Sequence, residues 1–138
     1  MTLDDFRGRV PGVGDVARWF TKAREAAHIS NHHIRVGAVI TLRSVIVGAG
    51  CNSLTKTHPE FRGQYISGLH AEMQATVGAR RHLFEGAVAW VYREKRDGSI
   101  GLARPCPACY NALNRVGVEK CIYTQPDSPV GYEIMRIG

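Results

Sequence analysis

Two short motifs constrain the fold of this chain more than any other part of its sequence. The first is "HAE" at residues 70–72, the second is "PCPAC" at 105–109, and the apolar stretch "GAVAWVYREK" at 86–95 lies between them. Cys106 and Cys109 are three positions apart, so both thiols lie on one side of the first turn of a helix. The free amides and the positive dipole end of that turn favour thiolates.

His70, Cys106 and Cys109 together make a set of three zinc ligands. Three protein ligands and a water molecule are what a catalytic zinc site requires. Glu72 is two positions from His70, a spacing that does not share one side of a regular helix. Both side chains can nevertheless reach past the start of their helix, and Glu72 would then contact the metal-bound water. We therefore expect a catalytic zinc site.

Each motif taken alone has another interpretation. Cys106 and Cys109 could be a redox pair or half of a structural zinc site. A redox pair gives no reason for the histidine and the glutamate. A structural site needs a fourth ligand, which Cys51 or Cys121 could provide. Cys121 alternates with apolar neighbours in a predicted strand and is better explained as a core residue, so the structural zinc site stays open as an alternative.

Apolar spacing and turn residues predict the order helix, strand, strand, helix, strand, helix, strand, strand. The predicted ranges are 14–30, 35–42, 44–50, 66–84, 86–95, 106–117, 119–124 and 132–137. In the helix at 66–84, an apolar stripe is expected at Met73, Val77 and Leu83 or Phe84. Strand–helix–strand units favour an α/β fold with parallel neighbours in its sheet. Only seven residues, 125–131, precede the last strand, which should therefore run antiparallel.

Length and charge limit the remaining possibilities. A chain of 138 residues fits one domain, expected to span 1–138. The formal net charge of +6 and the pI of about 9.5 are consistent with an anionic partner, and equally with a solvated basic surface. We find no apolar run of membrane length and no secretory signal in "MTLDDFRGRV". We expect a cytoplasmic protein with no membrane partner, whose four cysteines are ligands, catalytic groups or buried core residues rather than disulfides.

The two motifs resemble the signature of the zinc-dependent nucleobase deaminase superfamily, H-x-E…P-C-x-x-C, with its cytidine and deoxycytidylate deaminases. Three further stretches look like strands of that family: "RVGAVI" (35–40), "GAGCN" (48–52) and "GVEKCIYT" (117–124). The resemblance covers almost the whole chain. It implies a three-layer α-β-α cytidine-deaminase-like fold. Its five-stranded mixed sheet would carry helices on both faces and an antiparallel last strand.

By that resemblance the reaction is hydrolytic deamination with Zn²⁺ as the cofactor. His70, Cys106 and Cys109 are then the zinc ligands, and the metal lowers the pKa of water so that hydroxide is available. Glu72 takes the proton of the water and delivers it to the ring nitrogen and to the departing ammonia.

The resemblance also indicates substrate contacts. Asn52 matches an asparagine that hydrogen-bonds the sugar or base in relatives, although it could simply be a turn residue. The backbone at Ala71 and Pro105 is expected to orient the base. His58 and Arg62, with Lys56, place cations near the predicted pocket mouth, and Arg93, Arg96 and Arg104 flank its other edge. Further candidates for lining the pocket, each better explained singly as a core or surface residue, are Tyr110, Trp90, Tyr65 and His58.

We expect the substrate to be cytosine in a free nucleoside or nucleotide, such as cytidine, deoxycytidine or dCMP. The short C-terminal hairpin resembles that of the cytidine deaminases. However, His70 stands where cytidine deaminases usually have a third cysteine, and relatives with both histidine and hairpin act on polynucleotides. Cytosine, less readily adenine, within single-stranded DNA or RNA is therefore the alternative. Relatives often complete their pockets with a neighbouring subunit, so we expect a homo-oligomer.

Overall fold

A computed structural model describes residues 1–30, 34–53 and 70–138 of the chain. Its helices are the 3₁₀ helix η1 (Leu3–Asp5), α1 (Val16–Ala27), α2 (Ala71–Ala75) and α3 (Pro107–Val116). Its strands are β1 (Arg9–Val10), β2 (Gly14–Asp15), β3 (Arg35–Leu42), β4 (Val45–Cys51), β5 (Val88–Glu94), β6 (Ile100–Gly101), β7 (Lys120–Thr124) and β8 (Tyr132–Arg136). No helix in these described ranges is long and apolar enough for a membrane crossing.

The main sheet has the strand order β4-β3-β5-β7-β8, and β6 pairs with β5. Among the strands of the described residues, only β5 and β7 run parallel; the other pairs, including β7 with β8, are antiparallel. The predicted antiparallel last strand is confirmed. The prediction of five strands is wrong, because the part of the chain that the structure describes already forms six in this sheet. The sixth strand, β6, has only two residues, which is too short to show a periodic pattern in the sequence. It pairs with β5 because the turn at 96–99 reverses the direction of the chain.

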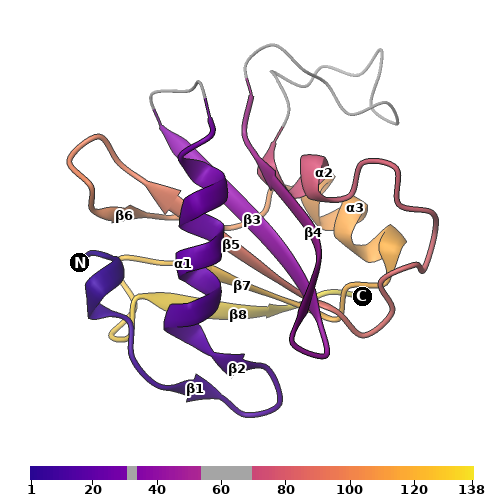
Figure 1. Cartoon of the computed structure of the whole chain (residues 1–138), viewed down its shortest axis with the longest axis horizontal. Helices are drawn as coiled ribbons and strands as arrows, with labels where there is room; N and C mark the ends of the chain where they lie inside the picture. The colour runs from indigo at the N-terminus through magenta and orange to yellow at the C-terminus, as the bar shows by residue number, and fades with distance from the viewer. Residues whose placement is uncertain (31–33, 54–69) are drawn as a thin grey trace.

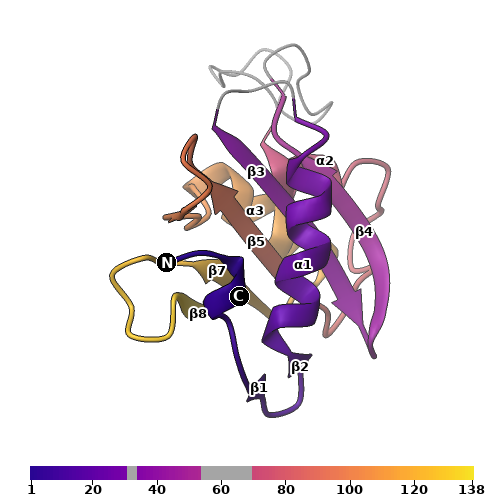
Figure 2. The same cartoon turned by 60° about the vertical axis from the view of Figure 1, so that its left-hand side comes forward.

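Helices cover both faces of the sheet, which confirms the three-layer α-β-α arrangement. In Figure 1, α1 lies in front of the sheet while α2 and α3 lie behind it, and Figure 2 shows the same layers from the side. Each face has its own core. Beneath α1 the core includes Phe20, Trp90 and Ile122, and on the opposite face it includes Ile40, Val91 and Leu113.

The first helix predicted from apolar spacing is present as α1. Asp15 caps its N-terminus by accepting a hydrogen bond from the Arg18 amide. The buried residues Val16, Trp19, Phe20, Ala23 and Ala27 follow helical spacing and face the sheet. The helix is shorter than the predicted range 14–30, because β2 precedes it and His28 ends it.

The segment before α1 has structure that the sequence analysis does not predict. It contains η1 and a small sheet in which β1 and β2 pair antiparallel. Phe6 is buried and stacks on Phe20, with 4.8 Å between the ring centroids. This contact extends the core on the α1 side toward Tyr132 of β8, whose ring lies 6.3 Å from that of Phe20.

The helix predicted at 66–84 is much shorter in the structure. Residues 66–69 lie outside the described part, and α2 ends at Ala75. Val77 and Leu83 are exposed rather than part of an apolar stripe, whereas Met73 and Phe84 are buried. The helix ends at the cap residue Thr76, and Gly78, with a φ of +79° in the left-handed region, prevents a right-handed helix from continuing beyond it. The predicted apolar stripe is therefore wrong beyond Met73.

Glycines in β4 allow α2 to lie directly on the sheet. A Cβ atom at Gly50 would come within 2.8 Å of the Ala71 oxygen and the Ala75 nitrogen, and a Cβ at Gly48 would come within 2.5 Å of the Ala75 oxygen. These neighbours are helix backbone atoms, which cannot rotate away. The absence of a Cβ atom at Gly48 and Gly50 thus permits the short distance between β4 and α2, and with it the position of His70 at the start of α2.

We expect Gly50→Ala to lower the free energy of unfolding by about 2 kcal/mol, as other overpacked cores do. Urea unfolding followed by circular dichroism would measure the change. Gly101→Ala is the matched control, because the three atoms nearest to its Cβ all belong to the Arg93 side chain, the first at 3.0 Å, and not to helix backbone. Equal stability of Gly50→Ala and the wild type would contradict this account of helix placement.

A buried carboxylate fastens the C-terminal end of α1 to the end of β5. Glu94 accepts hydrogen bonds from the Tyr92 hydroxyl at 3.0 Å and the Arg24 Nε at 3.2 Å, and its other oxygen lies 2.7 Å from the His28 Nε2. Burial alone would raise the pKa of Glu94, but the hydrogen bonds with His28 and Tyr92 bring that pKa below its ordinary value.

This shift makes stability depend on pH. Because the pKa of Glu94 is lower in the folded state, its contribution is present above the unfolded pKa and is lost as the pH falls through the folded pKa. Glu94→Gln should therefore be less stable than the wild type by about 1–2 kcal/mol at pH 7, and the difference should shrink below about pH 4. Urea titrations across this range would measure it. Glu25→Gln, which changes an exposed carboxylate, serves as control; a difference independent of pH would refute the assignment.

Candidate metal centre

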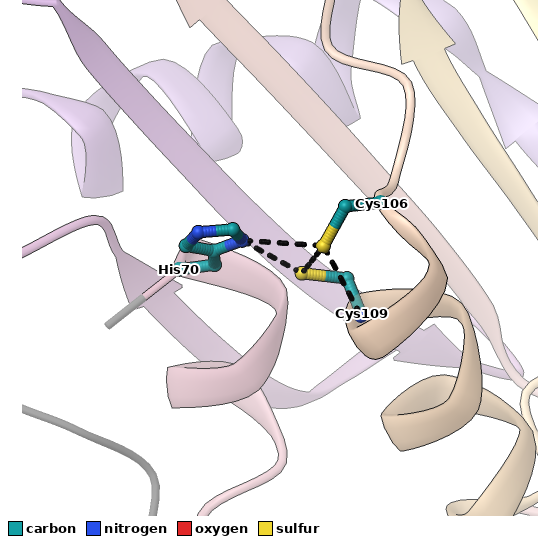
Figure 3. A group of neighbouring side chains, drawn as sticks. All are labelled: His70, Cys106 and Cys109. Atoms are coloured by element: carbon teal, nitrogen blue, oxygen red, sulfur yellow. Dashed lines mark hydrogen bonds between the residues drawn. The ribbon is translucent and has the colours of Figure 1, made fainter. Parts of the chain in front are cut away.

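The site lies where two helices begin on the same face of the sheet. His70 is the residue just before α2, and Cys106 holds the same position before α3. Pro107 occupies the first turn of α3, where its missing amide hydrogen costs nothing. Figure 3 shows the His70 ring and the sulfurs of Cys106 and Cys109 pointing toward one another from these two helix starts.

The three ligand atoms are close enough to hold one ion. The His70 Nδ1 lies 3.1 Å from the Cys109 Sγ and 3.5 Å from the Cys106 Sγ, and the two sulfurs are 3.4 Å apart. Ligand atoms of a tetrahedral zinc site are about 3.6–3.8 Å apart. Shifts of about half an ångström or less bring the three side chains to that geometry, so they fit a zinc ion, with Nδ1 as the histidine ligand.

The arrangement bears on both alternatives raised by the spacing. The sulfurs of Cys106 and Cys109 are too far apart for a disulfide, whose S–S bond is about 2.05 Å. Within the described residues, the group of potential ligands contains His70, Cys106 and Cys109 and no fourth side chain. Cys51 and Cys121 are buried in β4 and β7, outside that group. A three-ligand set leaves one coordination position for water or substrate.

The hydrogen bond between the two sulfurs shifts the pKa values of Cys106 and Cys109 in opposite directions. The sulfur–sulfur hydrogen bond, and then the one with His70, lower the pKa of Cys106 to about 4, so this thiol is ionised at neutral pH. The same sulfur–sulfur hydrogen bond raises the pKa of Cys109, which is also buried. The hydrogen bond with Cys106 raises the pKa of His70. A thiolate facing an imidazole is a favourable starting point for binding a cation.

Glu72 lies beside the ligands in the first turn of α2. Only 5% of its surface is exposed. Burial raises its pKa, and a hydrogen bond with the backbone amide of Glu72 itself and the charge of His70 lower it in part. A buried carboxyl with a raised pKa holds a proton more readily than an exposed one, which suits the role of a general acid–base.

Asn52 directly follows the last residue of β4, and its side chain makes two hydrogen bonds with backbone atoms. Its Oδ1 accepts a hydrogen bond from the Val36 amide at 3.0 Å, and its Nδ2 donates to the Ile34 carbonyl at 2.8 Å. Asn52 thus ties the end of β4 to the start of β3. One lone pair of Oδ1 and one hydrogen of Nδ2 remain for a further contact.

The other predicted substrate contacts differ in position. Ala71 and Pro105 are buried next to His70 and Cys106. His58 and Arg62 lie outside the described residues, as do Lys56 and Tyr65. Trp90 is not near the metal ligands, because it is fully buried under α1 on the opposite face and donates a hydrogen bond to Thr41.

One positioning residue escapes the sequence analysis. The Gln74 Oε1 accepts a hydrogen bond from the Cys51 amide, one turn of helix after His70. This bond joins α2 to the end of β4 and so supports the position of the site. Its spacing of four from His70 is ordinary for a helix, and no motif signal could have identified it.

Comparison with known proteins gives one family and several similar structures. The family described as "Cytidine and deoxycytidylate deaminase zinc-binding region" matches residues 15–125. No curated protein sequence matches the chain.

Three solved structures illustrate the likeness of the fold. A dCMP deaminase from the cyanophage S-TIM5 shares 22% identity over 79% of this chain and 81% of its own, with a TM-score of 0.56. A cytidine deaminase from Burkholderia pseudomallei shares 20% identity over 88% and 91%, with a TM-score of 0.58. A cytidine deaminase from Mycobacterium tuberculosis shares 23% over 88% and 89%, with a TM-score of 0.51.

We expect Cys106→Ala to lower the zinc content from about one ion per chain to a small fraction of that, because only two ligands remain. Metal analysis by mass spectrometry of the dialysed protein would measure it. Cys121→Ala removes a buried sulfur outside the ligand group and should keep its zinc. Retention of one zinc per chain by Cys106→Ala would show that the ion binds elsewhere.

Proposed function

Because this chain belongs to the cytidine and deoxycytidylate deaminase zinc-binding family, we propose that it converts cytosine to uracil in a free nucleoside or nucleotide. Zinc is the cofactor, and the reaction is the hydrolysis of a C–N bond. The observation that carries the proposal is the set of His70, Cys106 and Cys109 with the buried carboxyl of Glu72 beside it.

In this proposal each residue has a distinct task. His70, Cys106 and Cys109 hold the metal at the starts of α2 and α3. When bound, zinc supplies a Lewis acid that lowers the pKa of water toward neutrality. Glu72 accepts a proton from the water that attacks C4 of the base. It gives that proton to the ring nitrogen and assists the departure of ammonia, so that a C–O bond replaces the C–N bond.

The names of the structurally similar proteins support the preference for a free nucleoside or nucleotide. The similar structures are named cytidine deaminases and dCMP deaminases, and the cyanophage enzyme is described in complex with dCMP and dUMP. We propose that the remaining hydrogen-bonding positions of Asn52 meet the sugar or the base. The backbone at Ala71 and Pro105 would orient the base, and His58 and Arg62 would meet a phosphate.

A second candidate substrate, cytosine within single-stranded DNA or RNA, is favoured by one specific feature. A groove beginning at Pro105 carries two arginines, Arg104 and Arg136, and no acidic residue. Such a surface suits an anionic chain rather than an uncharged nucleoside.

A substrate panel would test the proposed reaction. It would contain cytidine, deoxycytidine, dCMP, adenosine, guanine and a single-stranded oligonucleotide, with released ammonia and the product base measured for each. We expect turnover of one or more of the three free cytosine compounds. Turnover of only adenosine or guanine would refute cytosine specificity, and turnover of only the oligonucleotide would favour the second candidate.

Glu72→Gln should keep its zinc and lose turnover by a factor of about 10²–10⁴, because the amide cannot accept and return the proton. Ammonia release and metal analysis on the same sample would measure both. Glu85→Gln changes an exposed carboxylate and is the matched control. Wild-type turnover by Glu72→Gln would remove this residue from the mechanism.

A further inference from the structure

Thr124 is the last residue of β7 and is fully buried. Its hydroxyl donates a hydrogen bond to the Gly101 carbonyl at 2.6 Å and accepts one from the Arg93 amide at 3.2 Å. Its own carbonyl accepts a hydrogen bond from the Ala103 amide at 2.9 Å. One residue therefore joins the ends of β5 and β6 to the connection that leads to α3.

These hydrogen bonds lie where β5 changes its neighbour in the sheet. β5 pairs with β7 as far as Val91 and Tyr123, and it pairs with β6 at Arg93 and Glu94. Thr124 directly follows Tyr123, so its hydroxyl lies at the junction of the three strands. A buried hydroxyl costs free energy unless it is hydrogen-bonded, and here it acts as both donor and acceptor. These two bonds distinguish threonine from valine, which has the same shape.

The connection from this junction to the metal centre is short and stiff. Only Arg104 and Pro105 separate Ala103 from Cys106. The ring of Pro105 fixes its own φ, and Pro107 favours extended backbone at Cys106, the residue before it. Cys106 adopts that conformation, with a φ of −70° and a ψ of 168°. A shift of Ala103 is therefore transmitted to Cys106 rather than absorbed between them.

The other two metal ligands are placed by other contacts. His70 begins α2, which lies on β4 at Gly50. Cys109 is buried in the contact between α2 and α3. Cys106 is half-buried and stands just before the first turn of α3. Its position relative to the sheet follows from the connection that Thr124 holds.

We propose that Thr124 is a positioning residue of the metal centre. Its hydroxyl and its carbonyl fix residues 101–103, and this segment presents the Cys106 sulfur opposite His70. Groups that orient a metal ligand without touching the metal typically change metal affinity by about 10–100-fold when they are removed. The proposal concerns zinc binding, so it does not depend on which base the site accepts.

Thr124→Val tests the proposal, because valine keeps the shape of threonine and removes both hydrogen bonds of the hydroxyl. The zinc-loaded full chain would be titrated with a chelating dye to give the dissociation constant of zinc. We expect Thr124→Val to weaken zinc binding about tenfold or more. Thr124→Ser, which restores the hydroxyl, should bind zinc as the wild type does.

The cobalt-substituted protein supplies a spectroscopic signature of the same effect. Absorption from sulfur-to-cobalt charge transfer depends on how the thiolates meet the ion, and therefore on the position of Cys106. We expect this absorption to change in Thr124→Val and to be that of the wild type in Thr124→Ser.

Thr41→Val is the matched control for a purely structural loss. Thr41 is also buried, and its hydroxyl donates to the Val88 carbonyl at 3.5 Å and accepts from the Trp90 Nε1 at 3.2 Å. It pairs with Val88 at the start of β5, the opposite end of that strand. Both valine variants should lower the free energy of unfolding in urea, whereas only Thr124→Val should weaken zinc binding.

Wild-type zinc affinity and an unchanged cobalt spectrum in Thr124→Val would overturn the proposal. Equal losses of zinc affinity in Thr124→Val and Thr41→Val would overturn it as well. If Thr124→Val does not fold, Thr124→Ala takes its place, because it removes the same hydroxyl and adds no atom, and the same outcomes decide. These measurements involve no turnover, so their result is separate from the test of the proposed deamination.

Discussion

The buried contact between α2 and α3 is the interaction on which the site depends. Met73 of α2 packs against Cys109 and Ala112 of α3. On its other side α2 lies on the backbone of β4 at Gly50. His70 is thus fixed from two directions opposite the thiols. Under the proposed function, misplacement of these groups by about 1 Å would cost on the order of 10²-fold in rate, so the packing of the two helices would contribute to catalysis.

The same contact provides the electrostatic environment of the site. It buries Cys109 and Glu72, while His70 and Cys106 stay half-exposed. Charges interact more strongly on the buried side, where water does not screen them. The half-exposed side leaves an approach for a ligand. One packing arrangement therefore explains both the raised pKa of Glu72 and the access that a substrate needs.

Much of the fold follows from local patterns, and the departures have identifiable causes. The central strands agree with continuous apolar runs to within two residues, and the antiparallel β8 follows from a connection too short for a parallel return. The long helix expected at 66–84 ends at Ala75, because apolar spacing continues in the sequence where the backbone has turned. Trp90 illustrates the same limit of local patterns. The apolar run in the sequence predicts that Trp90 lies in a buried strand, but it does not indicate which face of the sheet the side chain occupies.

The sequence by itself determined the chemistry that is available: a histidine, two cysteines and a glutamate at two helix starts, with their order along the chain. Only the tertiary structure decided how these groups behave. Asn52 is tied to Val36, sixteen residues away, and Glu72 is buried by helix packing. Hydrogen-bond partners and burial come from segments far apart in the chain, so no local pattern can encode them. The groove between α3 and β8 likewise exists only once the last strand has paired.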